Sequence, residues 1–206
     1  SGYTYRIPTY TDLYYSDSST QGNEFLLPEK ALSKELGFRH HQNYWKLSLT
    51  LFQRDTKNYI DYVKPKADKR WQATNIDQIL SQGGELDVIF NIGIHKFSMG
   101  YAYLKDDVDG VSSSLSRYAI NSRKHHLSTR WTLKWSSSVK SSISYRYSEQ
   151  DSGYHYNVVD ANIAVAKGRV KVSFSAHNIL NATYTEQNLV PMPKGHALLS
   201  LQYHMY

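Results

Sequence analysis

Four long segments of this chain alternate between apolar and polar residues, a pattern that restricts the possible folds. In the first segment, Trp45, Leu47 and Leu49 alternate with Lys46 and Ser48. The same rhythm returns over residues 127–135, 139–146 and 170–175. Successive side chains on a strand point to opposite faces, so each segment predicts a β-strand with one apolar and one polar face. Such strands suit either a soluble sheet or a transmembrane barrel, and the period alone does not separate the two.

The lengths of the strands and of their connections favour the barrel. We expect strands at 29–38, 44–54, 76–90, 95–105, 125–135, 139–148, 158–166, 169–177 and 197–206, after the end of a strand at 1–5. The short connections are 39–43, 91–94, 136–138 and 167–168, and they alternate with long ones at 6–28, 55–75, 106–124, 149–157 and 178–196. Alternating short turns and long loops are typical of outer-membrane barrels, whose strands need about 9–11 residues to cross the bilayer. The sequence therefore predicts an all-β, transmembrane antiparallel barrel.

Composition excludes several other classes of protein. No run approaches the roughly 18 consecutive apolar residues of a transmembrane helix. The formal net charge is +6, from 24 basic and 18 acidic residues, but the basic residues are dispersed, so nucleic acid is not an expected partner. Cysteine is absent, which leaves no thiolate chemistry. Trp45, Trp131 and Trp135 lie near strand ends, where an aromatic girdle would stand.

The first residues indicate that this chain is part of a larger barrel. Residues 1–5 read as the end of a strand, with no signal peptide before them. An open sheet edge in lipid would leave backbone groups without hydrogen-bond partners. We therefore expect further strands from an upstream segment or from another chain, and any targeting segment upstream.

Several short motifs follow one another along the chain in a defined order. They are Tyr5-Arg6-Ile7-Pro8-Thr9, Asp12-Leu13-Tyr14, Gly22-Asn23, Leu27-Pro28-Glu29-Lys30, Glu35-Leu36-Gly37, Asn58-Tyr59-Ile60, Gly84-Glu85 and His177-Asn178-Ile179-Leu180-Asn181-Ala182-Thr183-Tyr184. In this order the chain resembles the C-terminal part of TonB-dependent outer-membrane transporters, over essentially its whole length. The subgroup it is most similar to is the vitamin B12 (cobalamin) receptors. Lys194-Gly195-His196 departs from the family's usual Gly-Arg turn.

The resemblance implies an organisation and a set of partners. Residues 1–206 would form the C-terminal portion of the barrel, about ten strands of about 22. The plug domain and the first strands would lie outside this chain. The implied function is TonB-dependent uptake of a scarce ligand across the bacterial outer membrane, best assigned as vitamin B12 or another corrinoid. The implied partners are the N-terminal part of the barrel with its plug, TonB acting through the plug, outer-membrane lipid, the ligand and a surface lipoprotein.

Binding residues are expected in the long connections, because loops on a rigid scaffold carry specificity. The candidates for ligand binding are the aromatic residues Tyr10, Tyr14, Tyr15, Tyr154 and Tyr156. Their rings would suit a corrin ring or the flat faces of a siderophore, although each could instead pack loop against loop. We expect the motif residues Pro8, Pro28, Gly22-Asn23, Asn178 and Asn181 to shape turns.

Neither catalysis nor a resident cofactor is expected. The pairs His40-His41 and His125-His126 do not predict a metal site, because adjacent side chains on a strand point to opposite faces. No catalytic triad, carboxylate pair or phosphate-binding glycine loop stands out. Three alternatives remain open: a siderophore or haem transporter of the same family, a passive porin-like barrel, and a soluble β-sandwich binding module.

Overall fold

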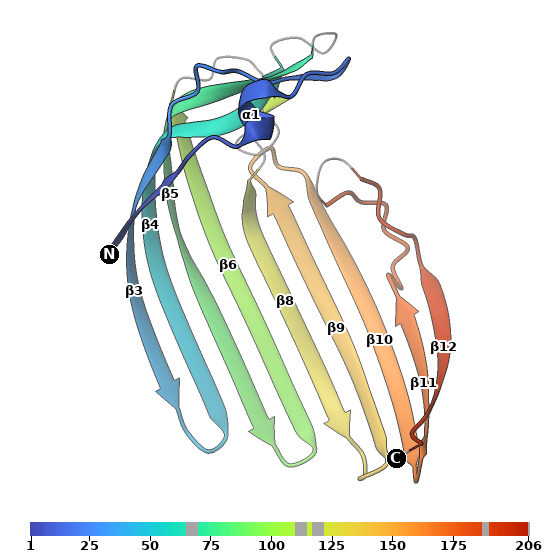
Figure 1. Cartoon of the computed structure of the whole chain (residues 1–206). Helices are drawn as coiled ribbons and strands as arrows, with labels where there is room; N and C mark the ends of the chain where they lie inside the picture. Colours follow the sequence, from blue (N-terminus) through green and yellow to red (C-terminus); the bar gives the residue numbers. More distant parts are fainter. Residues whose placement is uncertain (65–69, 110–114, 117–121, 187–189, 206) are drawn as a thin grey trace.

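The strands of this chain form a single curved sheet (Figure 1). The computed structural model describes residues 1–64, 70–109, 115–116, 122–186 and 190–205. The main strands are β1 (Gly2–Arg6), β3 (Glu29–His41), β4 (Trp45–Lys64), β5 (Trp71–Ile92), β6 (His95–Asp109), β8 (Arg123–Lys134), β9 (Val139–Gln150), β10 (His155–Lys167), β11 (Val170–His177) and β12 (His196–Tyr203). They pair in this order, each antiparallel to the next. The all-β antiparallel fold class is confirmed.

Two short strands and one short helix complete the described structure. Strand β2 (Thr20–Gln21) pairs in parallel with β5, and β7 (Leu115–Ser116) pairs with β4, so the sheet counts 12 strands. Helix α1 (Tyr10–Tyr14) lies within the first long connection. Among the described residues, no helix has both the length and the apolar character to cross a bilayer.

The strand register gathers apolar side chains on one face. One row runs across neighbouring strands from Trp45 to Phe90, Phe97, Trp131 and Ile143. Directly opposed residues of an antiparallel pair share a face, so these side chains form a continuous band. All of these residues except Trp45 are exposed, as the expected transmembrane barrel requires of its outer face.

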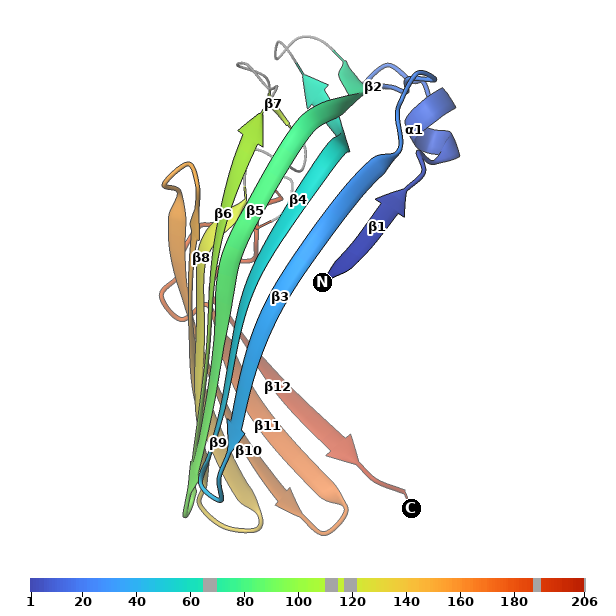
Figure 2. The same cartoon turned by 90° about the vertical axis from the view of Figure 1, so that its left-hand side faces the viewer.

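The opposite face is polar and lies on the concave side. A parallel row there runs through Ser48, Asp87, Gly100, Ser128 and Arg146. Seen from the side, β1 and β12 curve to the same side of the central strands, as in part of a barrel wall (Figure 2). One curved sheet does not match a soluble β-sandwich, which needs two facing sheets, so that alternative is wrong.

Several of the expected strand ends on the long-loop side are wrong, although β3 starts at residue 29 and β11 ends at residue 177 as expected. The range 55–75 is not a loop, because β4 continues to Lys64 and β5 starts at Trp71, with 65–69 outside the described residues. Strand β6 likewise extends to Asp109, and β8 begins at Arg123. The expected loop 149–157 is reduced to 151–154. The sequence prediction ended these strands too early because their extensions are rich in polar residues and lack the regular alternation of the preceding segments.

The extended part of β4 and β5 is held by a small core of its own. Leu26, Ile60, Tyr62 and Ala73 are buried together, with Leu13 packed against them. Ile76 and Ile79 form a second cluster nearby along β5. The connection 7–28 thus packs on the extended hairpin through Leu13 and Leu26.

Candidate functional site

The long-loop end of the sheet carries the predicted binding residues, and a polar network fixes their positions. Helix α1 begins with a capping box, in which the Thr9 hydroxyl accepts from the Asp12 amide and the Asp12 carboxylate accepts from the Thr9 amide. Asp12 also accepts from Arg6 at 2.9 Å and from the Tyr62 hydroxyl at 3.1 Å. The helix is therefore fastened both to β1 and to β4.

The surroundings of Asp12 keep it charged. Burial would raise the pKa of this carboxyl, but the hydrogen bonds from Thr9 and Tyr62 and the charge of Arg6 outweigh burial. The result is a pKa below its ordinary value. Asp12 is thus a buried carboxylate whose donors come from three separate segments.

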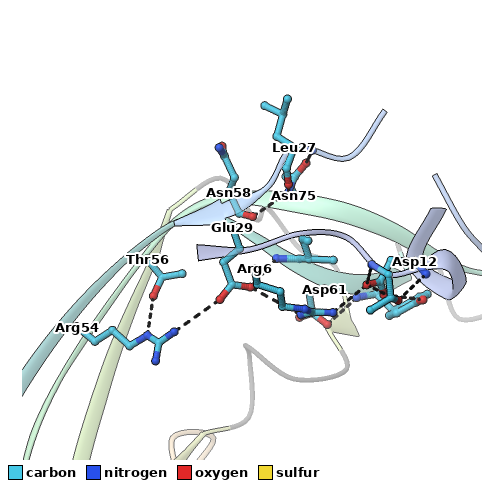
Figure 3. A network of polar contacts seen from close by, with 12 residues as sticks. Arg6, Asp12, Leu27, Glu29, Arg54, Thr56, Asn58, Asp61 and Asn75 are labelled. Atoms are coloured by element: carbon cyan, nitrogen blue, oxygen red, sulfur yellow. Dashed lines mark hydrogen bonds and ion pairs between the residues drawn. The ribbon is translucent and has the colours of Figure 1, made fainter. Parts of the chain in front are cut away.

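A second buried carboxylate, Glu29, lies between two guanidinium groups (Figure 3). Its oxygens are 3.8 Å from the nearer Arg6 nitrogen and 3.7 Å from the nearer Arg54 nitrogen. The Ile60 amide also donates to Glu29, at 3.5 Å. Because β1, β3 and β4 each supply one charged group, the first strands are held together at the rim.

Asn75 ties the first long connection to the extended hairpin, and Asp61 ties the hairpin to β7. The Asn75 side chain accepts from the Leu27 amide at 2.8 Å and donates to the Leu27 carbonyl at 3.0 Å, which imitates a strand pairing (Figure 3). Its Nδ2 also donates to the carbonyl of Asn58, which has a positive φ of 53°. Asp61 is fully buried and accepts from the Tyr62 amide and the Ser116 hydroxyl.

Three of the five predicted tyrosines lie in the connection 7–28, which this polar network holds in place. We call the part of this connection that carries them the aromatic platform. Tyr10 and Tyr14 face solvent from α1, with ring centroids 5.2 Å apart, and Tyr10 is 78% exposed. Tyr15 follows the helix and donates its hydroxyl to Asp17 at 3.0 Å, which raises the pKa of Tyr15. Phe25, 87% exposed, was missed by the sequence analysis, and its aromatic character within a long connection was the available signal. The platform therefore displays aromatic rings on a rigid base.

The other two predicted tyrosines lie on and just before β10. Tyr154 is exposed, and its hydroxyl accepts from the Thr185 amide at 3.2 Å. Tyr156 is only 5% exposed, because its ring stacks on Tyr184 at 4.5 Å. Its ring is 6.3 Å from that of Tyr154. The structure thus brings the five tyrosines together as two groups, one on the first connection and one on β10.

Tyr154 and Tyr156, which we call the β10 group, lie next to a charged pair on the concave face. Arg146 of β9 contacts Glu186 at 2.9 Å and donates to the Tyr184 hydroxyl at 3.4 Å. The Tyr156 hydroxyl donates to the same Glu186 oxygen at 3.3 Å. Arg146 belonged to the predicted polar face, whereas nothing in the sequence indicated Glu186 as its partner. This cluster anchors the connection after β11 to the barrel wall.

The exposed rings of Tyr10, Tyr14 and Tyr154 are chemically suited to non-covalent contacts. Exposed rings offer flat apolar faces with polar edges, and the anchored connections limit the entropy lost on binding. Within the described ranges, no group of three His, Asp or Glu side chains is placed to hold a metal ion.

Comparison with known proteins identifies relatives of this fold. The family described as TonB dependent receptor-like, beta-barrel matches residues 1–182. The vitamin B12 transporter BtuB of Photobacterium profundum is 28% identical over 205 residues, covering 91% of this chain and 32% of that protein. The chain spans a third or less of the length of the curated relatives it matches.

Solved structures agree on the architecture. The copper transporter OprC superposes with a TM-score of 0.80 at 15% identity, covering 98% of this chain and 36% of that one. The siderophore receptor PirA of Acinetobacter baumannii gives a TM-score of 0.70 at 17% identity, covering 89% and 33% of the two chains. Identities this low establish a shared fold and nothing more.

Proposed function

The chain belongs to the TonB-dependent receptor β-barrel family of outer-membrane proteins, and we propose that residues 1–206 supply the C-terminal portion of the barrel of an active transporter. In this proposal, the plug domain and the first strands belong to the rest of the protein. The single observation that carries the proposal is the family match over residues 1–182. The apolar outer band and polar concave face of the sheet support it.

The proposed mechanism divides the work between the long-loop end and the plug. The aromatic platform at α1 and the exposed Tyr154 of the β10 group capture a scarce ligand at the cell surface. TonB, acting through the plug, then opens a path along the polar concave face. The chain contributes binding and a rigid wall, and no catalytic step. Outer-membrane lipid and a surface lipoprotein are the further partners in this proposal.

Vitamin B12 or another corrinoid is the ligand we propose. Support comes from the relative in Photobacterium profundum, a vitamin B12 transporter that aligns with 91% of this chain. A corrin ring is large and flat, and the exposed rings of Tyr10 and Tyr14 offer complementary apolar faces.

A siderophore or haem is the second candidate ligand, within the same mechanism. Its support is that one of the superposed structures is a siderophore receptor, with a TM-score of 0.70. A passive porin-like barrel would have the same wall but would not depend on TonB.

Uptake by cells that carry the full-length protein tests two parts of the proposal, the dependence of transport on TonB and the identity of the ligand. Radiolabelled cyanocobalamin should bind saturably to cells lacking their own receptor, and should accumulate only when TonB is present. Binding without any dependence of uptake on TonB would support the porin. Failure of cyanocobalamin to bind, together with TonB-dependent uptake of a ferric siderophore or haem, would overturn the corrinoid assignment but keep the transporter.

A further inference from the structure

A groove of about 290 Å³ opens on the apolar outer face, close to the short-turn end of the sheet. It crosses strands β8, β9, β10 and β11. We propose that this groove is a binding site for one acyl chain of a phospholipid from the periplasmic leaflet of the outer membrane. The inference rests on family membership and on geometry, and not on which ligand the transporter takes up.

Two neighbouring rows of side chains build the groove. One row is Trp131, Ile143, Ala161 and Ala176, and the next is Leu133, Ser141, Ile163 and Phe174. Large residues occupy the β8 end of both rows, and the small residues lie on a diagonal from Ser141 of β9 to Ala161 of β10 and Ala176 of β11. Ser141, Ala161 and Ala176 therefore form the floor, while the larger side chains form the walls.

Polar contacts of two indoles hold side chains of the groove in place: Trp131 belongs to the lining, and Trp135 lies outside it but bonds Ser141 of the lining. The Trp131 ring stacks on His95 at 5.8 Å and donates to its Nδ1 at 3.3 Å. The Trp135 indole donates to the Ser141 hydroxyl at 2.9 Å. These bonds satisfy both indole N–H groups on the apolar face, so the rings are oriented before any lipid arrives. A pre-oriented groove loses less entropy on binding than a mobile surface.

The position of the groove indicates which molecule would occupy it. It is continuous with the outer band of large apolar residues, which in this family contacts the bilayer. It adjoins the short turn at 135–138, and short turns of outer-membrane barrels face the periplasm. The periplasmic leaflet consists of phospholipid, and its acyl chains are the apolar groups present at this depth. Ser141, Ser142 and Asn162 also line the groove, but most of its exposed lining is apolar, which suits a hydrocarbon chain and not a headgroup.

Native mass spectrometry of the full-length protein in mild detergent tests the site. The probe is palmitoyl-oleoyl phosphatidylethanolamine, titrated into delipidated protein. Ala176→Phe and Ala161→Phe should fill the groove, raise the Kd of the tightest bound lipid at least tenfold and lower the retained lipid count by one. Leu49→Phe adds similar bulk to the same face on β4, outside the groove, and should behave as wild type.

If Ala161→Phe or Ala176→Phe does not fold, a fluorescence measurement that does not need these variants tests the proposal. Lipid with a brominated acyl chain quenches nearby tryptophan fluorescence, and the difference between wild type and Trp131→Phe isolates the quenching at Trp131. We expect strong quenching that saturates at one lipid per barrel. Equal lipid retention in all variants, or quenching that grows linearly with lipid, would overturn the proposal. Retention of lipopolysaccharide in preference to phosphatidylethanolamine, or dimerisation abolished by Ala176→Phe, would also reject it.

Discussion

The Tyr62 hydroxyl donates to Oδ1 of Asp12 at 3.1 Å, across 50 positions of sequence. Tyr62 stands on the part of β4 beyond the expected strand end, and Asp12 lies in the first turn of α1. This bond links helix α1 directly to the extended hairpin, in addition to the Asn75–Leu27 bonds and the apolar core.

Replacing the carboxylate should loosen the platform. Asp12→Asn removes the charge facing Arg6 and one acceptor of the capping box, and should destabilise the connection 7–28 by about 1–3 kcal/mol. Hydrogen exchange of amides 9–26 in the full-length protein measures the loss. Asp77→Asn, an exposed carboxylate on β5, is the matched control. Unchanged protection in Asp12→Asn would show that the network does not hold the platform.

Lowering the pH should loosen the platform in the same way as Asp12→Asn. Because folding lowers the pKa of Asp12, its contribution to stability is fully present above the unfolded pKa of about 3.9 and is lost as pH falls through the folded pKa. Proteolysis of the platform should therefore accelerate as pH falls below about 4. The Asp12→Asn variant should lack this component of the pH profile, and an identical profile in both proteins would contradict the assignment.

A side chain at Gly83 should damage the barrel wall. A Cβ there would clash with the Tyr103 carbonyl oxygen and would lie 2.6 Å from Cζ of the Phe52 ring. Gly83→Ala should therefore destabilise the β4–β5–β6 region by about 1–3 kcal/mol, as overpacking does. Thermal unfolding followed by gel mobility in detergent measures the shift. Gly37→Ala is the control, because its Cβ would come no closer than 3.9 Å to the nearest atoms. Equal midpoints for the two variants would argue against the close contact.

The Arg146–Glu186 pair should hold the connection after β11 to the wall. Both side chains are partly exposed, so solvent screening limits their coupling to about 0.5–1 kcal/mol. A double-mutant cycle of Arg146→Ala and Glu186→Ala, read by hydrogen exchange at residues 178–186, measures it. The coupling should also weaken in high salt. Additive single effects would mean that Tyr184 and Tyr156 hold the connection without the ion pair.

The exposed tyrosines of α1 should contribute to ligand affinity. Tyr10→Ala and Tyr14→Ala should each cost about 1 kcal/mol, roughly a fivefold rise in the Kd of the transported ligand. Equilibrium binding of labelled cyanocobalamin to full-length protein is the measurement. Tyr44→Ala removes an exposed tyrosine from the short-turn end and should leave affinity unchanged. Unaltered affinity in both α1 variants would remove these residues from the binding site.

The sequence by itself determined the strands, the faces they present and the class of barrel. Alternation with period two is a local property, so residues such as Trp131 and Arg146 could be assigned to opposite faces from their positions alone. The order of short and long connections added the antiparallel arrangement, which the structure confirms.

Only the tertiary structure decided how the connections fold back. Tyr156 is buried because Tyr184 stacks on it, and β4 extends beyond residue 54 because the connection 7–28 packs on it. These contacts join residues far apart along the chain, and they depend on the path of each connection in space. Local sequence pattern carries no information about that path, whereas packing and hydrogen bonding between distant segments fix it.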